Sequence, residues 1–267
     1  MTQVIETPLR GSPPEEIPLD AAPLVRVIAQ VRYPLIASVE TAGFIGPFQE
    51  AIRDEYPVLR PEKSRNVVLG PKDAISTRYD VLWRFHDESE TWRVTLAPGF
   101  LAIETSRYTS RNDFLDRLRR VLTELHAHVN PRTVDRLGVR YIDRIVGRNL
   151  SDLPQLVRPE MAGILATPLA KDAQQLIAEA LFRLPEGEDQ LRARWASVPA
   201  GSTVDPAAVD PIDEPSWILD LDAFSQEFGA FEVESIGARA RTLAERIYSF
   251  FRWVVTDEFH RRHGGRS

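Results

Sequence analysis

Three stretches between residues 79 and 103 alternate apolar with polar residues, and only short turns separate them. Trp83 and Phe85 are apolar positions of the first stretch, and Trp92 and Val94 are apolar positions of the second. Alternation with a period of two is typical of strands that bury one face. Connections this short join antiparallel strands, because parallel neighbours need a crossover of about a dozen residues or more. The segment therefore predicts an antiparallel meander.

The same kind of reasoning predicts the other elements of the chain. Alternation indicates strands at residues 23–33, 134–146, 176–184, 190–198 and 217–222, and helical spacing of apolar residues indicates helices at 46–55, 111–128 and 232–260. Ser110 or Asn112 is suited to cap the second helix. We therefore expect an α+β fold of two similar halves, each an antiparallel sheet with helices packed on one face.

Proline-rich segments mark the expected boundaries. Residues 1–20 contain four prolines and few large apolar residues, which predicts a disordered N-terminal arm. The two halves are expected at residues 21–150 and 151–267. A second proline-rich segment, residues 199–215, has little aliphatic content and is expected to be an exposed, mobile loop.

Composition excludes several chemistries. The 267 residues include no cysteine, which removes thiol nucleophiles, thiolate metal sites and iron–sulfur clusters. Of the 33 basic residues only three are lysines and none follows a glycine, so the sequence has no Gly-Lys-Ser/Thr phosphate loop. The glycine motif of dinucleotide-binding folds and the Gly-x-Ser-x-Gly elbow are also missing. We accordingly expect no cofactor, no metal site and no recognisable set of catalytic residues.

Hydropathy and charge limit the possible partners. No apolar run approaches the ~18 residues of a membrane span, and the N-terminal residues lack the pattern of a secretory signal peptide. We expect a cytoplasmic protein that does not bind membranes. The net charge of −6 argues against generic binding of nucleic acid.

Arginines gather on one face of the predicted sheet. In the strand at 134–146 three arginines share a face opposite a row of apolar residues, and the meander shows the same separation. Guanidinium groups hold phosphate oxygens well. The candidate ligand-binding residues are therefore Arg84, His86, Arg93, Arg136, Arg140 and Arg144. The alternative is a solvated face whose arginines pair with acidic neighbours such as Asp80 and Glu104.

Two smaller groups of polar residues have structural explanations as well as functional ones. Asp220 and Asp222 share a strand face, so they could hold Mg²⁺ or pair with arginines of the neighbouring strand; no third ligand is apparent, which favours the pairing. His260 and His263 are three residues apart near the end of a helix. Their basic surroundings favour an ordinary surface over a metal site.

Two helices carry features that bear on assembly. The arginines of the helix at 111–128 are expected to form its solvated face. Phe250, Phe251 and Trp253 form an aromatic group wider than one helical stripe, which leaves open a contact with the other half or with a second copy in a homodimer.

Four segments resemble a sporadically distributed bacterial family of functionally uncharacterised proteins of about this length. They are the strand residues 23–34, the run Arg-Leu-Gly-Val-Arg-Tyr-Ile that begins at 136, residues 219–222, and residues 255–259. The resemblance extends from about residue 23 to residue 260, and the run from 136 is its most specific part. The family pattern usually has Asn where this chain has Asp143. The resemblance implies no reaction and no catalytic residues.

Two functions remain open at this point. The preferred one is a non-catalytic binding or accessory protein that recognises a protein partner or an anionic ligand, because no set of catalytic residues is visible. The alternative is an enzyme without sequence motifs that acts on a phosphate-bearing substrate. In that enzyme Arg84, Arg140 and Arg144 would hold the anion. His86 or Asp143 would act as acid or base.

Overall fold

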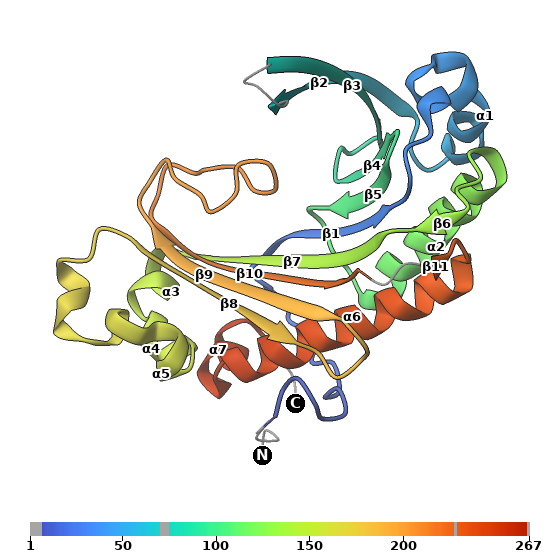
Figure 1. Ribbon diagram of the computed structural model, residues 1–267. Coiled ribbons are helices and arrows are strands. Elements are labelled where there is room, and N and C mark those ends of the chain that lie inside the picture. The colour runs from blue at the N-terminus through green and yellow to red at the C-terminus, as the bar shows by residue number, and fades with distance from the viewer. Residues whose placement is uncertain (1–6, 70–74, 227–228, 266–267) are drawn as a thin grey trace. The chain divides into compact units, whose positions relative to one another are not determined.

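One antiparallel sheet of nine strands runs through the chain in the computed structural model (Figure 1). The structure describes residues 7–69, 75–226 and 229–265, of which 63–69 and 75–80 are described by their backbone alone. The strand order is β2-β3-β4-β5-β1-β7-β10-β9-β8, and β6 and β11 form a separate pair. The strands are β1 (Leu24–Arg32), β2 (Val58–Leu69), β3 (Ile75–His86), β4 (Trp92–Ala97), β5 (Phe100–Thr105), β6 (Thr133–Val134), β7 (Arg136–Val146), β8 (Leu176–Arg183), β9 (Gln190–Val198), β10 (Ser216–Ser225) and β11 (Gly229–Ala230).

Helices accompany this sheet, so the expected α+β class with an antiparallel sheet is confirmed. The α-helices are α1 (Ala42–Ile52), α2 (Arg111–His128), α3 (Gly147–Ser151), α4 (Leu153–Leu156), α5 (Pro159–Ala162), α6 (Val233–Val254) and α7 (Asp257–Arg262). Three short 3₁₀ segments cover Ala37–Glu40, Gly163–Ala166 and Pro168–Lys171.

The chain divides into two compact units, and each is discontinuous in sequence. Unit 1 consists of residues 1–27, 139–225 and 242–267, and unit 2 consists of residues 28–138 and 226–241. Three of the four passages between units fall inside β1, β7 and α6. The units therefore do not follow the expected boundary at residue 150, because these long elements each contribute residues to both.

Unit 2 places α2 on the apolar face of its strands. Ser110 caps α2 by accepting a hydrogen bond from the Asp113 N–H at 3.1 Å, as predicted. The Phe114 ring of α2 stacks on Trp92 of β4 with ring centroids 5.8 Å apart. The expected meander of β3, β4 and β5 is confirmed by its antiparallel registers. The side chain of Asp80, expected to pair with arginines, lies outside the described residues.

Unit 1 places aromatic residues of α6 against β8. The Phe250 ring packs 5.5 Å from Phe182 and 5.5 Å from Trp253, and Phe251 contacts Phe259 of α7 at 5.6 Å. The aromatic group singled out in the sequence thus has partners within unit 1. The single helix predicted for residues 232–260 is wrong in one respect. The helix breaks at Thr256, whose side chain caps α7 by accepting from the Phe259 N–H at 3.3 Å.

Residues 7–22 of the N-terminal arm take an extended path over α6 and α7. The Ile17 N–H donates to the Tyr248 hydroxyl at 2.7 Å, and the Ala21 N–H donates to the His263 carbonyl at 3.2 Å. Arg246 of α6 donates to the Gly11 carbonyl at 2.6 Å. Residues 7–20 are therefore ordered, contrary to the expected disorder. Side chains of α6 form hydrogen bonds with backbone N–H and C=O groups of the arm, which lies outside the helices and strands. Residues 1–6 lie outside the described residues.

Candidate functional site

A cluster of charged side chains joins β7, β9 and β10 on one face of unit 1. Arg140 donates to both carboxylate oxygens of Asp220 at 2.7 Å, and its remaining nitrogen contacts Asp205 Oδ2 at 2.9 Å. Arg194 of β9 donates to Glu179 at 3.1 Å. Three arginines and three aspartates line a small cavity of about 70 Å³: Arg140, Arg192, Arg194, Asp205, Asp220 and Asp222. The cluster is thus a network of paired charges.

Mutual pairing fixes the ionisation of the residues in this network. Burial alone would lower the pKa of Arg140, but hydrogen bonds and charge interactions with Asp220 and Asp205 raise it above its ordinary value. Burial likewise opposes ionisation of Asp205, yet its bond to Arg140 brings the pKa of this carboxyl below its ordinary value. Asp220 therefore pairs with an arginine, but this arginine is Arg140 of β7, whereas the sequence suggested Arg192 and Arg194.

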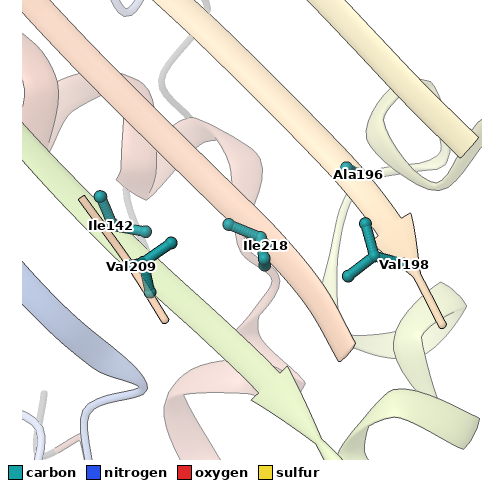
Figure 2. Close-up of a cluster of buried hydrophobic side chains, with 5 residues drawn as sticks. All are labelled: Ile142, Ala196, Val198, Val209 and Ile218. Carbon is teal, nitrogen blue, oxygen red and sulfur yellow. The ribbon is translucent and has the colours of Figure 1, made fainter. Parts of the chain in front are cut away.

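The proline-rich segment 199–215 covers this face of unit 1. Val209 is 5% exposed and packs with Ile142 of β7, Ile218 of β10, and two small side chains of β9 (Figure 2). The Gly201 N–H donates to the Ile212 carbonyl at 2.7 Å and so closes the loop on itself. Most residues of this loop are exposed, as expected, but its few aliphatic residues form a second small core on the arginine face.

Arg144 and Asp143 lie on opposite faces of β7. Arg144 donates to the Asp210 carbonyl of the covering loop at 2.5 Å. Asp143 points the other way, as strand alternation requires, and is 6% exposed. Burial raises the pKa of Asp143 to about 7. Asp143 therefore cannot act on an anion held by Arg140 and Arg144, as the enzyme alternative requires.

The candidate residues of the meander lie in unit 2, each beside a charged neighbour. Arg84 pairs with Glu62 at 3.0 Å, and Arg93 pairs with Glu104 at 2.8 Å. His86 lies opposite Arg93 in the register of β3 and β4. Burial, followed by the charges of Arg93 and Arg60, lowers the pKa of His86 below its ordinary value. His86 is thus neutral at pH 7, and the two arginines are paired locally as the solvated-face alternative expected.

Arg136 takes part in a different feature of unit 2. Its guanidinium group folds back over Gly138, where a Cβ atom would lie 2.6 Å from Arg136 Nη1. Glycine at 138 therefore permits the position of this side chain. Arg136 lines a surface cleft of about 530 Å³, together with Arg32, Tyr33, Pro34, Leu35, Gly99, Asp135 and Gln226.

Backbone hydrogen bonds hold the walls of this cleft. The Tyr33 N–H donates to the Gly99 carbonyl at 3.1 Å, and the Tyr33 hydroxyl donates to the Ala97 carbonyl at 3.0 Å. The Asp135 N–H donates to the Arg32 carbonyl at 2.8 Å. Leu35 is 52% exposed, a large apolar side chain at the rim. Among the candidate residues only Arg136 lies here, because the cleft forms where four segments that are separate in sequence meet.

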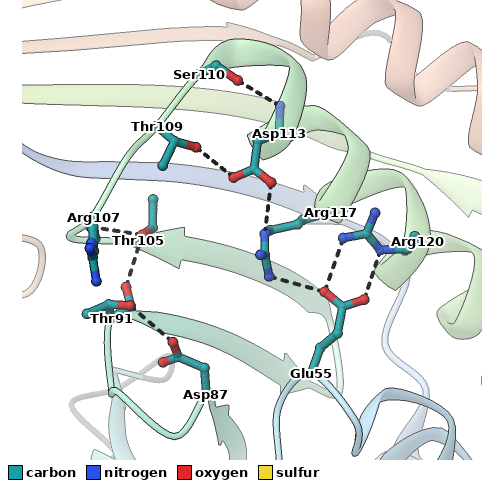
Figure 3. A network of polar contacts seen from close by, with 10 residues as sticks. All are labelled: Glu55, Asp87, Thr91, Thr105, Arg107, Thr109, Ser110, Asp113, Arg117 and Arg120. Carbon is teal, nitrogen blue, oxygen red and sulfur yellow. Dashed lines mark hydrogen bonds and ion pairs between the residues drawn. The ribbon is translucent and has the colours of Figure 1, made fainter.

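Two arginines of α2 belong to a polar network (Figure 3), while Arg119 and Arg120 remain about half exposed, as expected for a solvated face. Arg117 and Arg120 both donate to Glu55, at 3.1 Å and 2.9 Å. Arg117 also reaches Asp113 at 3.3 Å, and its guanidinium carbon lies 4.5 Å from the centre of the Trp92 ring. This network ties α2 to the segment after α1 and explains two of the arginines structurally.

His260 and His263 are both buried, at 8% and 5% exposure, so the expectation of an ordinary surface here is wrong. The His263 ring stacks on Phe259 with centroids 4.1 Å apart, and its Nδ1 lies 2.8 Å from the Phe259 carbonyl. Within the described parts of the chain, no group of three or more His, Asp or Glu side chains is arranged to hold a metal ion.

Comparison with known proteins adds no assignment. No protein-family model matches the chain, and no curated protein matches it. The resemblance to a sporadic bacterial family therefore remains a prediction. Among the residues that the structure describes, no helix is both long and apolar enough to cross a bilayer.

Proposed function

We propose that the protein is a non-catalytic binding protein, and that the cleft at Arg32 and Arg136 recognises an acidic segment of a protein partner. The observation that carries this proposal is the composition of the cleft: two arginines, against a single aspartate, stand beside an exposed leucine on a hydrogen-bonded frame. Arginine pairs with carboxylates through two parallel hydrogen bonds. Arginine and aromatic residues are also enriched in protein interfaces.

The other arginine groups support a non-catalytic role by their pairing. Arg140 is bound to two aspartates, and the loop at 199–215 lies over this face. Arg84 is paired with Glu62 in the other unit. The phosphate-processing alternative gains no support from these contacts, since it needs arginines that are open to a substrate.

Two broader expectations accompany this proposal. A bacterial, cytoplasmic protein is proposed on the sequence alone. The order of the elements supports a common origin of two similar halves. The strand β1 is followed by helices and by a meander whose last strand, β5, pairs with β1. The strand β7 is likewise followed by helices and by a meander whose last strand, β10, pairs with β7.

Charge reversal at the cleft tests the binding function. Arg32→Glu changes an exposed residue at the cleft, and Arg148→Glu changes an arginine whose side chain is 93% exposed on α3 and serves as the matched control. The full-length proteins are purified from the native host and compared by native mass spectrometry. We expect a protein partner with the wild type and with Arg148→Glu, and its loss with Arg32→Glu. A partner retained by Arg32→Glu, or a small anion in place of a protein, would contradict the proposal.

A further inference from the structure

The strand β8 is an open edge of the nine-stranded sheet. Among the described residues it pairs with β9 alone, through eight consecutive residue pairs without a bulge. Ile177 and Leu181 on this strand are each 57% exposed. Natural edge strands are usually protected from further pairing by lysine, proline or a bulge. The opposite edge strand, β2, contains Pro61 and Lys63, whereas β8 contains neither residue type.

The unpaired backbone groups of β8 belong to the residues with exposed side chains. The Leu184 N–H donates to the Asp189 carbonyl of the β9 side at 2.8 Å. Backbone groups alternate in direction along an antiparallel ladder. Residues 178, 180 and 182 therefore face β9, and residues 177, 179, 181 and 183 present their N–H and C=O groups outward. The edge is thus ready to accept another strand.

We propose that β8 pairs antiparallel with β8 of a second copy of this chain, with the two-fold axis at Leu181. This register places Leu181 opposite itself and Glu179 opposite Arg183, and symmetry repeats the charge pair on the other side of the axis. On the opposite face, Ala180 lies across from Phe182. Apolar and opposite-charge pairs across strands are both stabilising. A self-complementary patch of this kind is what a two-fold interface requires.

The charged side chains favour this register over the two registers whose axes lie at Glu179 or Ala180. An axis at Glu179 would place two glutamates opposite each other, which is destabilising. An axis at Ala180 would place Glu179 opposite Leu181, and Arg183 opposite Ile177, so neither charge would have a partner. Within one copy Glu179 contacts Arg194 of β9 at 3.1 Å, so in the dimer it would share its charge between this arginine and Arg183 of the second copy.

A cysteine scan of the full chain tests this register, because the protein has no native cysteine. In the proposed dimer the two Cα atoms at position 181 lie about 5.5 Å apart, as in any hydrogen-bonded antiparallel pair, and this separation suits a disulfide. Positions 177 of the two copies would be about 27 Å apart. We expect Leu181→Cys to form a covalent dimer under mild oxidation and Ile177→Cys to remain uncrosslinked. Equal or preferred crosslinking of Ile177→Cys would overturn the register.

Sedimentation equilibrium on the uncrosslinked protein tests the dimer itself. Wild type is expected to dimerise, and Leu181→Lys, which brings two positive charges together at the axis, should raise the dissociation constant by at least about tenfold. Leu169→Lys is the matched control, since Leu169 is 59% exposed outside β8. Circular dichroism shows whether each variant is folded. A wild type that stays monomeric, or a dimer unaffected by Leu181→Lys, would overturn the proposal.

Discussion

Asp143 is a carboxyl group on the apolar face of β7. Its neighbours on that face, Tyr141 and Ile145, are buried hydrophobic residues, and Asp143 itself is 6% exposed. Burial raises its pKa to about 7. The unfolded chain ionises this group near its ordinary pKa of about 4. As the pH rises from 4 to 7 the unfolded state therefore loses the proton first, and the native state becomes relatively less stable.

Replacement of Asp143 by Asn should remove this loss of native-state stability at neutral pH. We expect Asp143→Asn to raise the free energy of unfolding by about 2–4 kcal/mol at pH 7.5 and to change it little at pH 4, because the amide fills the same space without ionising. Urea denaturation at both pH values measures the difference. A gain of equal size at pH 4 would assign the effect to packing rather than to the charge.

His260 makes the stability of the native state depend on pH in the opposite direction to Asp143. Burial, and then the charge of Arg252, lower the pKa of His260 to about 4, with Asp257 acting in the other direction and His263 adding a small further lowering. Among the described residues, neither ring nitrogen of His260 has a hydrogen-bond partner. Since the unfolded chain takes up this proton near pH 6.5, the native state loses stability as the pH falls from 6.5 to 4.

The variant His260→Phe should separate the two effects. We expect it to stabilise the protein by up to about 3 kcal/mol more at pH 4.5 than at pH 7.5, because phenylalanine keeps the ring and cannot be protonated. His128→Gln, at a half-exposed position on α2, is the control for replacing a histidine elsewhere in the fold. Thermal unfolding across this pH range measures both; a pH-independent effect of His260→Phe would show that packing alone is responsible.

At the scale of single elements, the loop at 199–215 is held by few residues. Val209 is its only buried hydrophobic side chain, and Asp205 fixes it to Arg140 at 2.9 Å. Arg144 and Arg194 donate to the carbonyls of Asp210 and Val204, and Val204 and Ala208 pack beside Val209. Removal of two methyl groups at residue 209 should therefore weaken the whole covering of the arginine face.

We expect Val209→Ala to lower the free energy of unfolding by about 1–2 kcal/mol and to increase amide exchange within residues 200–212. Ala207→Ser, an exposed position on the same loop, is the matched control and should leave both unchanged. Hydrogen exchange with mass spectrometry locates the effect. If the loop exchanges as rapidly in the wild type as in the variant, Val209 does not anchor it.

The local pattern of apolar and polar residues predicted most helices and strands well, but it predicted the contacts between them poorly. The strand β9 has the predicted bounds, 190–198, because its alternation is uninterrupted. The strand β2 was missed, since Val58–Leu69 contains a proline and a run of polar residues. The burial of Val209 was missed because the loop has little aliphatic content, and the residues of β7, β9 and β10 that pack against it come together only in the folded sheet. For the same reason the sequence grouped six candidate residues that the structure distributes over two units.

At the scale of the whole molecule, the path of the chain through the two units determines which fragments can fold alone. Unit 1 needs residues 1–27 and 139–150 as well as the C-terminal part, and unit 2 needs residues 226–241, which contain β11 and the start of α6. A boundary at residue 150, which the sequence suggested, therefore separates each unit from strands or helices of its own. In particular, the fragment 151–267 lacks β1 and β7, and Asp220 loses its partner Arg140.

We expect neither 1–150 nor 151–267 to unfold cooperatively when produced alone, because a charge left buried without its partner costs about 3–5 kcal/mol on top of the missing strand contacts. The two fragments mixed at equal concentration should recover a single cooperative transition, since together they supply every segment of both units. Circular dichroism during thermal unfolding measures this for each fragment and for the mixture. Full-length protein carrying Arg148→Glu, a change at an exposed side chain just before the cut, controls for local effects at that site. Cooperative unfolding of an isolated fragment would mean that the boundary at residue 150 divides two independent domains after all.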